Sequence, residues 1–234
     1  MTFDIADIQK LMETQEELAP ELEQYLDDGP LGGRCLRHPL VYSIFWAPQM
    51  NAMLNEQFRQ KRAAVIDARR QENWHGFVYL HERPYRLDAF VDTAWRMRDQ
   101  EYWEILGGIY IDTENLWQNK DQWVECLTAD RRLRSRLMRA EDRVTLQSHD
   151  PVIEVYRGYN SGGTVDGLSW TTSADVARFF ARRLADTGAT MYLSEGRVKR
   201  ARVLAYFNGR SEQEMLVLPG GVKDITTKTL GVQE

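Results

Sequence analysis

The spacing of apolar residues in the first thirty positions predicts two amphipathic helices. Apolar side chains recur every three or four residues over 5–12 and again over 18–26, which is the period of one helix face. Pro20 predicts the start of the second helix, because proline is accommodated in a first helical turn. The segment carries nine carboxylates and one basic residue, Lys10. We interpret 1–30 as acidic helices that cap the body of the protein, with a detachable arm that binds a partner as the alternative.

The pattern from residue 34 to residue 150 is mostly helical. Leu54 and Phe58 belong to a run with apolar residues at helical intervals, and Pro84 predicts a break in the pattern. The tryptophans and tyrosines that follow are dense enough to predict a well-filled helical core. We therefore expect 1–150 to form a mostly helical part.

The pattern changes after residue 150, where strand periods replace helical ones. A strand, a loop, a short strand, a helix and two further strands are predicted in turn at 151–160, 161–167, 168–173, 174–186, 197–208 and 212–220. Ser173 is a suitable N-cap for the helix. Its apolar positions, Val176, Phe179 and Phe180, fall at i, i+3 and i+4. This order indicates an α+β fold with a separate core over 151–234, or else one continuous domain.

Composition limits the broad class of protein. The 234 residues are 43% hydrophobic and 28% charged, which is ordinary for a folded chain with a real core. The net charge of -5 disfavours a general nucleic-acid coat and leaves a local basic site open. Cys35 and Cys126 lack metal-like spacing and predict no disulfide framework. Neither a long apolar run nor a secretory signal is visible, so we expect a cytoplasmic protein without membrane contact.

An arginine-rich run, RRLRSRLMRAEDR, stands out at 131–143. It is predicted to form one charged helix, with Leu133 and Leu137 on one face and arginines on another. Because arginine binds phosphate bidentately, one interpretation is a contact surface for a nucleic acid or a dinucleotide. We favour the other interpretation, a solvated face partnered with the acidic N-terminal helices.

The chain lacks the signatures of several common active sites. Its four histidines, His38, His75, His81 and His149, are scattered. The stretch HERPY from His81 lacks the second histidine of a zinc-protease helix, and Pro84 interrupts any helix there. We therefore expect no metal. No Ser-His-Asp arrangement and neither common glycine-rich phosphate motif can be found in the sequence.

Two carboxylates, Glu212 and Glu214, lie one residue apart just before an apolar run. In a β-strand residues i and i+2 share a face, so both side chains would project the same way. Two like charges held close together inside a cleft are unfavourable, whereas open water tolerates them. On spacing alone a solvated strand end is the simpler interpretation, and a chemical role inside a cleft is the alternative.

Three motifs after residue 150 follow one another in a set order. They are YRG at 156–158, LSWTTS at 168–173 followed by ADVARFFA, and EQEMLVLP at 212–219. In this order they resemble the ADP-ribosyltransferases of the arginine, serine, glutamate class, of the bacterial or phage type, which include toxins. The resemblance covers the last third of the chain. The family's middle motif is usually Ser-Thr-Ser, and Trp170 interrupts it here, so Ser169 and Thr171 are both candidates for the key serine role.

The resemblance implies a role for each motif residue. Glu214 would stabilise the positive charge that develops as the bond between nicotinamide and ribose breaks. Glu212 would orient or deprotonate the acceptor, and Arg157 would bind the NAD phosphates. The implied catalytic residues are Glu214, Glu212, Arg157 and Ser169. The implied cofactor-binding residues are Tyr156, Arg157, Gly158, Ser169, Trp170, Thr171 and Phe179. For Phe179 burial in the core is the alternative, and we favour it.

The resemblance also implies a fold and an activity. The fold is a split β-sheet core with flanking helices, here preceded by the mostly helical part. The activity is transfer of ADP-ribose from NAD, as co-substrate, to a protein arginine or a nucleic acid, with release of nicotinamide. A toxin or effector of this kind would have an inhibitory antitoxin as a partner. The alternatives are an NAD glycohydrolase, in which water replaces the acceptor, and an inactive module that binds a nucleotide or a protein.

Overall fold

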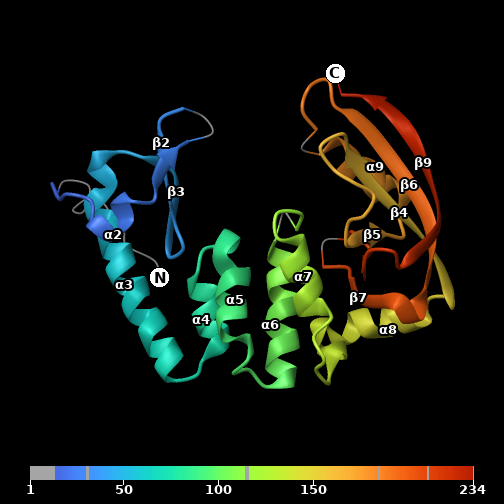
Figure 1. Cartoon of the computed structure of the whole chain (residues 1–234), viewed down its shortest axis with the longest axis horizontal. Coiled ribbons are helices and arrows are strands. Elements are labelled where there is room, and N and C mark those ends of the chain that lie inside the picture. Colours follow the sequence, from blue (N-terminus) through green and yellow to red (C-terminus); the bar gives the residue numbers. More distant parts are fainter. Residues whose placement is uncertain (1–13, 30–31, 114–115, 184, 210, 234) are drawn as a thin grey trace. The chain divides into compact units, whose positions relative to one another are not determined.

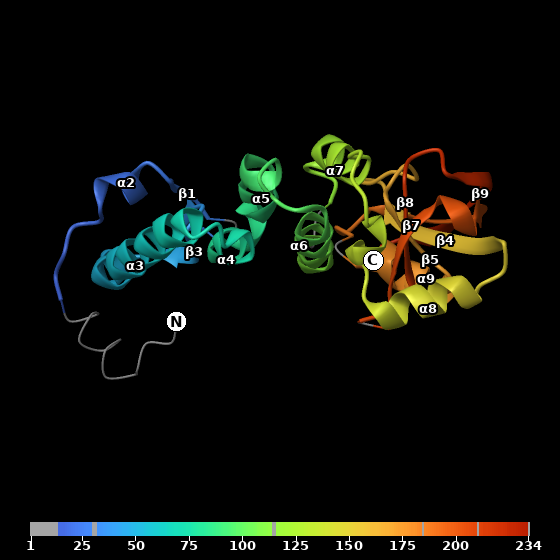
Figure 2. The same ribbon diagram turned by 90° about the horizontal axis from the view of Figure 1, so that it is seen from below.

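The computed structural model describes residues 14–29, 32–113, 116–183, 185–209 and 211–233. The chain forms two compact units, Met1–Met97 and Arg98–Glu234 (Figures 1 and 2). Each unit combines helices with an antiparallel sheet, which confirms the α+β class. The first predicted helix, at 5–12, lies outside the described residues.

The N-terminal unit contains a three-stranded sheet and a set of helices. Its helices are α2 (Pro20–Glu23), α3 (Asn51–Arg70), α4 (Trp74–Leu80) and α5 (Arg86–Ala94), with 3-10 turns at Pro48–Met50 and Arg83–Tyr85. Its strands are β1 (Leu26–Asp28), β2 (Arg34–His38) and β3 (Val41–Trp46). They pair antiparallel in the order β1-β2-β3. The predicted break at Pro84 is confirmed, since this residue lies in the 3-10 turn before α5.

The strands of this unit correct two predictions. The second predicted helix ends at Glu23 after one turn, because residues 26–28 pair with β2 as a strand. The segment 34–46, placed in the mostly helical part, forms the β2–β3 hairpin. Its second strand, VYSIFW, is rich in β-branched and aromatic residues, which pack well on a pleated surface. The helical prediction holds from Asn51 onward to the end of α5.

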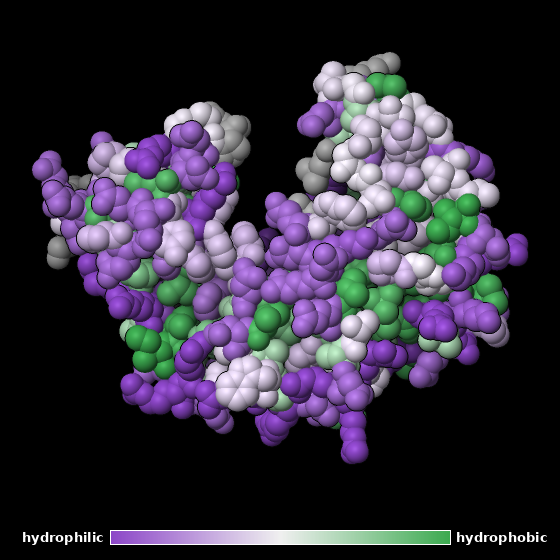
Figure 3. Space-filling model, viewed as in Figure 1, coloured by the Kyte–Doolittle hydropathy of each residue, from purple (hydrophilic) through white to green (hydrophobic). Residues whose placement is uncertain are grey.

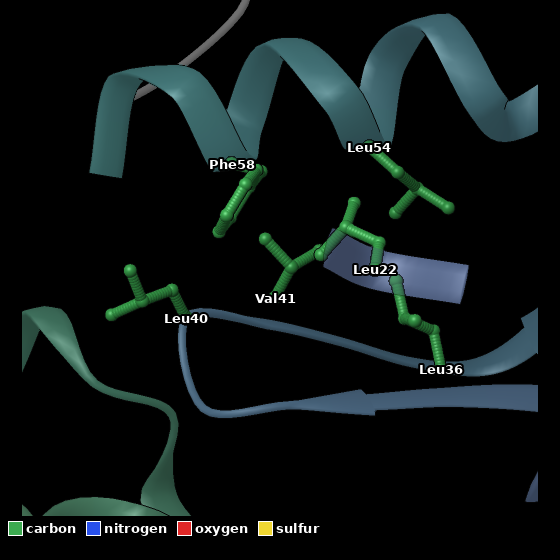
Figure 4. Close-up of a cluster of buried hydrophobic side chains, with 6 residues drawn as sticks. All are labelled: Leu22, Leu36, Leu40, Val41, Leu54 and Phe58. Carbon is green, nitrogen blue, oxygen red and sulfur yellow. The ribbon is translucent and has the colours of Figure 1, made fainter. Parts of the chain in front are cut away.

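The core of the N-terminal unit joins α3 to the hairpin. Six buried hydrophobic side chains form one cluster: Leu22, Leu36, Leu40, Val41, Leu54 and Phe58. In Figure 4 the side chains of α3 point toward those of the hairpin, and Leu22 of α2 lies between them. Because apolar burial is the dominant favourable term in folding, this cluster is what holds α2 and the hairpin on α3.

The acidic N-terminal segment has basic partners within its own unit. Glu16 pairs with Arg59 of α3 at 3.1 Å, and Glu21 pairs with Arg62 of the same helix at 3.3 Å. Both pairs are largely exposed, so each stabilises the fold by less than about 1 kcal/mol. Two of the segment's carboxylates therefore complement α3 within the same unit. The predicted partnership with the arginine run at 131–143 stays a prediction.

The C-terminal unit contains a six-stranded antiparallel sheet. Its helices are α6 (Asp99–Asp112), α7 (Lys120–Leu127), α8 (Ala140–Ser148) and α9 (Ala174–Arg182), with 3-10 turns at Arg134–Leu137 and Arg200–Arg202. Its strands are β4 (Val152–Asn160), β5 (Ser169–Thr171), β6 (Thr190–Lys199), β7 (Val203–Phe207), β8 (Glu214–Val217) and β9 (Val222–Val232). The strand order is β7-β8-β5-β4-β6-β9. The strand predicted at 197–208 is thus the end of β6 followed by β7, with a 3-10 turn between them.

Three of the helices before residue 150, α6, α7 and α8, are part of this unit. In Figure 1 α8 runs beside β7, with which it is in contact, and the 3-10 turn at Arg134–Leu137 contacts both α6 and β7. Every residue of β7 is buried, as expected for a covered strand. The sequence patterns place the start of the separate core at 151, whereas the compact unit begins at Arg98. Helical periodicity shows that a face is buried and does not show which sheet buries it.

The prediction that the arginine run at 131–143 forms one helix is wrong. The backbone leaves the helical region at Leu133, where φ is 62°, and again at Met138, which is extended. Arg131 and Arg136 form ion pairs with carboxylates of α6 at 3.3 Å and 3.7 Å. The run is therefore divided between a turn that packs on α6 and the start of α8.

The surface seen in Figure 3 is mostly hydrophilic, and its hydrophobic side chains form separate patches. Among the described residues, no helix combines the length and the apolar character that crossing a membrane requires.

A partly buried histidine makes the N-terminal unit sensitive to acid. The ring of His38, at the end of β2, lies edge-on to Tyr25 and Phe58. Its Nδ1 accepts a hydrogen bond of 3.0 Å from the backbone N–H of Leu40. Burial, with a smaller contribution from His81, lowers the pKa of His38 from 6.5 to about 4. The folded unit therefore holds His38 in its neutral form, and protonation of Nδ1 would remove the hydrogen bond.

We predict that the N-terminal unit loses stability as the pH falls from 6.5 towards about 4, because the unfolded chain protonates His38 in this window and the folded chain does not. Amide hydrogen exchange in β2 and α3 should accelerate over that window. The variant His38→Asn should reduce the acceleration, whereas His75→Asn, which changes an exposed ring, should leave it intact. Equal reductions in the two variants would contradict the assignment.

Candidate functional site

A pocket with a volume of about 320 Å³ opens in the C-terminal unit. It is lined by the end of α6, strands β4 and β5, helix α9, and the segment that leads into β8. Its charged side chains are Asp142, Glu212, Glu214, Arg139, Arg157 and Arg183. Most of its other lining residues are apolar or aromatic. A concave site with a few convergent polar groups in an apolar wall is the usual form of a small-molecule site.

Glu214 is the first residue of β8 and lies against the pocket wall. The hydroxyl of Tyr110, from α6, donates a hydrogen bond of 2.6 Å to Oε1 of Glu214. The side chain of Ser169, from β5, forms a further hydrogen bond with this carboxylate. The carboxylate is thus held from two different elements, which fixes its orientation at the pocket.

The surroundings of Glu214 act on its charge in opposite directions. Burial raises the pKa of Glu214 above its ordinary value, and the nearby Glu212 raises it further. The hydrogen bonds from Ser169 and Tyr110, together with the charge of Arg157, act to lower this pKa. Perturbed carboxyl groups in a pocket are candidates for a chemical role.

Glu212 lines the same pocket, but it lies in a turn and not in the predicted strand. The strand begins at Glu214, and Glu212 lies in a turn in which Ser211 and Gln213 have φ values of 57° and 48°. This left-handed backbone is uncommon outside glycine. Both glutamates line the pocket, but the turn, rather than strand alternation, brings them together.

The turn that carries Glu212 is fixed by hydrogen bonds from two neighbours. Thr171 Oγ1 donates to the carbonyl of Glu212 at 2.7 Å, and Thr172 Oγ1 donates to the side chain of Gln213 at 2.7 Å. Asn208 Oδ1 accepts from the backbone N–H of Gln213 at 3.3 Å. Strained turns persist where their surroundings hold them in place, and these contacts supply that support.

Arg157, in the middle of β4, holds its guanidinium group in the pocket wall. Nη1 donates to the carbonyl of Ser169 at 2.7 Å, and Nε donates to the carbonyl of Thr164 at 3.1 Å. Gly167 makes room for the group, because a Cβ at that position would lie 2.1 Å from the guanidinium carbon. Burial lowers the pKa of Arg157, but an arginine starts high enough to stay charged. The result is a fixed cation beside the pocket.

The structure separates the roles of Ser169 and Thr171. Both lie on β5, which pairs with β8 so that Thr171 is opposite Glu214. Ser169 bonds the carboxylate of Glu214, whereas the Thr171 hydroxyl bonds the carbonyl of Glu212 and accepts from the N–H of Ser173. Ser169 is therefore the residue that contacts the carboxylate, and Thr171 supports the turn and the start of α9.

The remaining predicted residues divide into those in the pocket wall and one outside it. Tyr156, Gly158 and Trp170 line the pocket, and the hydroxyl of Tyr156 donates to Glu154. Trp170 is buried between its neighbouring strands. Phe179, in contrast, is 58% exposed and is not among the lining residues.

The favoured alternative for Phe179, burial in the core, is wrong, because the side chain is 58% exposed. Its predicted cofactor contact stays a prediction, at a residue that does not line the pocket. The face of α9 that packs on β4 carries Ala177 and Ala181, because Gly158 of β4 lets the helix backbone approach closely. The pocket face carries Val176 and Phe180. Phe179 is on neither face, and its ring meets that of Phe180 in a T-shaped arrangement, at 5.4 Å between ring centroids.

Sequence reasoning missed Tyr110 and Asp142 as site residues. Tyr110 lies 104 residues before Glu214 in a helix whose apolar pattern gave no sign of a special position. Asp142, in the first turn of α8, is buried and accepts a hydrogen bond from the backbone of Asn208. Burial raises the pKa of Asp142. It thereby anchors the segment that leads to the turn at Glu212.

The described residues contain no cluster of three or more histidine, cysteine, aspartate or glutamate side chains placed to hold a metal ion. The chemistry available in the pocket is that of a half-buried carboxylate, a second carboxylate on a fixed turn, and an arginine with fixed geometry. Such a set can stabilise a developing positive charge, accept a proton and bind an anionic group.

Comparison with known proteins gives no match to a family model, to a curated protein or to a solved structure.

The close approach of α9 to β4 gives a test of how the pocket is built. A Cβ on Gly158 would lie 1.6 Å from the carbonyl oxygen of Ala177, so Gly158→Ala must push the helix away. We predict that it lowers the stability of the C-terminal unit by about 1–3 kcal/mol, measured by thermal unfolding. Gly209→Ala is the control, because a Cβ there meets nothing within 4 Å. Equal stability of both variants would show that the packing is looser than described.

Proposed function

We propose that the C-terminal unit is an NAD-dependent ADP-ribosyltransferase. The observation that carries the proposal is Glu214, a carboxylate that Tyr110 and Ser169 hold at a pocket that also contains the guanidinium of Arg157. The three motif residues come from three adjacent strands, β4, β5 and β8. All three line one pocket, which supports the resemblance of the sequence motifs to those of ADP-ribosyltransferases.

Glu214 acts on the bond between nicotinamide and ribose. When this bond breaks, its electron pair leaves with nicotinamide and positive charge develops on the ribose, as in glycoside cleavage. A fixed carboxylate in a partly buried site stabilises this charge more strongly than one in open water. Ser169 and Tyr110 keep the carboxylate oriented and favour its charged form, which is the form that the step requires.

Arg157 binds the diphosphate of NAD. Two of its donors are used on carbonyl groups of the chain, and a guanidinium has five N–H donors. The donors that remain offer a planar group to phosphate oxygens. Hydrogen bonds to the two carbonyls and close packing against Gly167 restrict the movement of the Arg157 side chain. Little conformational entropy is therefore lost when phosphate binds.

Glu212 acts on the acceptor. The acceptor nucleophile forms a bond to the ribose carbon as nicotinamide departs, and Glu212 takes the proton that the nucleophile loses. The turn at Ser211–Gln213 places this second carboxylate in the same pocket as Glu214. The acceptor is a protein arginine or a nucleic acid. With water in its place the same site would be an NAD glycohydrolase, and transfer of label from NAD to a macromolecule distinguishes the two.

We predict that Glu214→Gln slows NAD consumption by about 100-fold, which corresponds to about 3 kcal/mol of lost charge stabilisation. Nicotinamide release from NAD is the measurement. Glu125→Gln is a matched control, because Glu125 is exposed and does not line the pocket. Activity of the Glu214 variant within a few-fold of the wild type would remove this residue from the chemistry.

We further predict that Arg157→Lys raises the dissociation constant for NAD at least about tenfold, since a lysine cannot reproduce bidentate phosphate contacts. Gly167→Ala should have a similar effect without touching the arginine, because its Cβ would displace the guanidinium. Calorimetric titration of NAD measures both. Gly163→Ala, in the same loop, is the control, as its nearest atoms lie at an ordinary 3.4 Å. Unchanged affinity in the first two variants would place NAD elsewhere.

A further inference from the structure

Tyr110, from helix α6, donates a hydrogen bond to the carboxylate of Glu214. It lies in the last turns of α6, and its side chain is 2% exposed. Its ring stacks on Phe207 of β7 at 5.2 Å between centroids and meets Trp123 of α7 edge-on at 5.6 Å. A ring held by packing on two sides presents its hydroxyl in a fixed direction, here at 2.6 Å from Oε1 of Glu214.

We propose that Tyr110 is a positioning residue for Glu214, which orients the carboxylate and keeps it charged for the cleavage of NAD. This inference rests on the proposed function. Charge-assisted hydrogen bonds are stronger than neutral ones and hold the acceptor in a narrower range of orientations. Helix α6 would therefore belong to the catalytic machinery through this hydroxyl, in addition to lining the pocket.

The charged and polar groups around Glu214 determine in which direction the loss of the Tyr110 hydroxyl would shift the pKa of Glu214. Burial and Glu212 raise the pKa of Glu214, whereas Ser169, Tyr110 and Arg157 lower it. The other charged groups of the pocket are two arginines and one carboxylate, Arg139, Arg183 and Asp142. Burial raises the pKa of Tyr110 well above its ordinary value, so the hydroxyl keeps its proton and remains a donor. Loss of that donor removes one of the groups that lower the pKa of Glu214, so this pKa should rise.

The test compares two substitutions on the same helix in the full-length protein. Tyr110→Phe removes the hydroxyl and keeps the packed ring. Tyr102→Phe makes the same change at a side chain that is equally buried, 3% exposed, and whose hydroxyl donates to the carbonyl of Cys126 at 2.8 Å. Thermal unfolding checks that both variants are folded. Nicotinamide release is then measured for each against pH.

For Tyr110→Phe we expect kcat to fall about tenfold at its pH plateau, equivalent to about 1.4 kcal/mol. We also expect the acid limb of the profile to move up by about one pH unit, with KM for NAD changed less than kcat. Tyr102→Phe should match the wild type in all three. A purely structural role for Tyr110 would leave the acid limb in place, and an unchanged profile would overturn the proposal.

A second measurement separates this proposal from the proposed function. The pKa of the Glu214 carboxyl can be followed by carbon-13 NMR in protein labelled on glutamate, without NAD, with Glu214→Gln identifying the signal. In Tyr110→Phe this pKa should rise, and in Tyr102→Phe it should not. If the wild type fails to consume NAD, the proposed function is wrong, while the titration still tests the contact. An unchanged Glu214 pKa in Tyr110→Phe would overturn the proposed role of the hydroxyl.

Discussion

The C-terminal unit holds one half-buried carboxylate, Glu214, at its pocket. Removing a charged group from water is costly unless hydrogen bonds and opposite charges compensate, and Glu214 is compensated by Tyr110, Ser169 and Arg157. These partners come from a helix and two strands, so three elements together compensate the charge of the carboxylate. The same compensation leaves the group oriented and its pKa perturbed. The requirement of folding and the requirement of the proposed chemistry are therefore met by the same contacts.

The rest of the unit maintains this arrangement. The short strand β5 is flanked by β4 and β8, which brings the three motifs onto adjacent strands although long stretches of chain separate them. Gly158 allows α9 to lie close against β4, and Gly167 leaves space for the guanidinium of Arg157. Asp142 and Thr171 fix the segment on either side of Glu212. These four residues support the site indirectly, because each one positions a helix, a side chain or a turn that lines the pocket.

The sequence could predict what local patterns encode. The α+β class, the start of the helix at Ala174 and the pocket residues Arg157, Ser169 and Glu214 were within reach, because each motif is short and contiguous. The end of that helix, predicted at 186, lies at Arg182. Tyr110 was not, since its partner lies 104 residues away and its helix is patterned like any buried helix. The arginine run misled for a related reason: helical spacing of side chains cannot reveal a left-handed residue such as Leu133. The exposure of Phe179 depends on two alanines and a glycine that face each other across α9 and β4, which only the packed structure brings together.

The central claim is that NAD binds in this pocket with its reacting ribose at Glu214. The most direct measurement is a crystal structure of the Glu214→Gln protein with NAD, in which slow cleavage preserves the ligand. We expect the diphosphate against the guanidinium of Arg157 and a hydroxyl of the nicotinamide ribose within hydrogen-bond distance of residue 214. NAD bound at another place, or an empty pocket in crystals of a folded protein at saturating NAD, would contradict it.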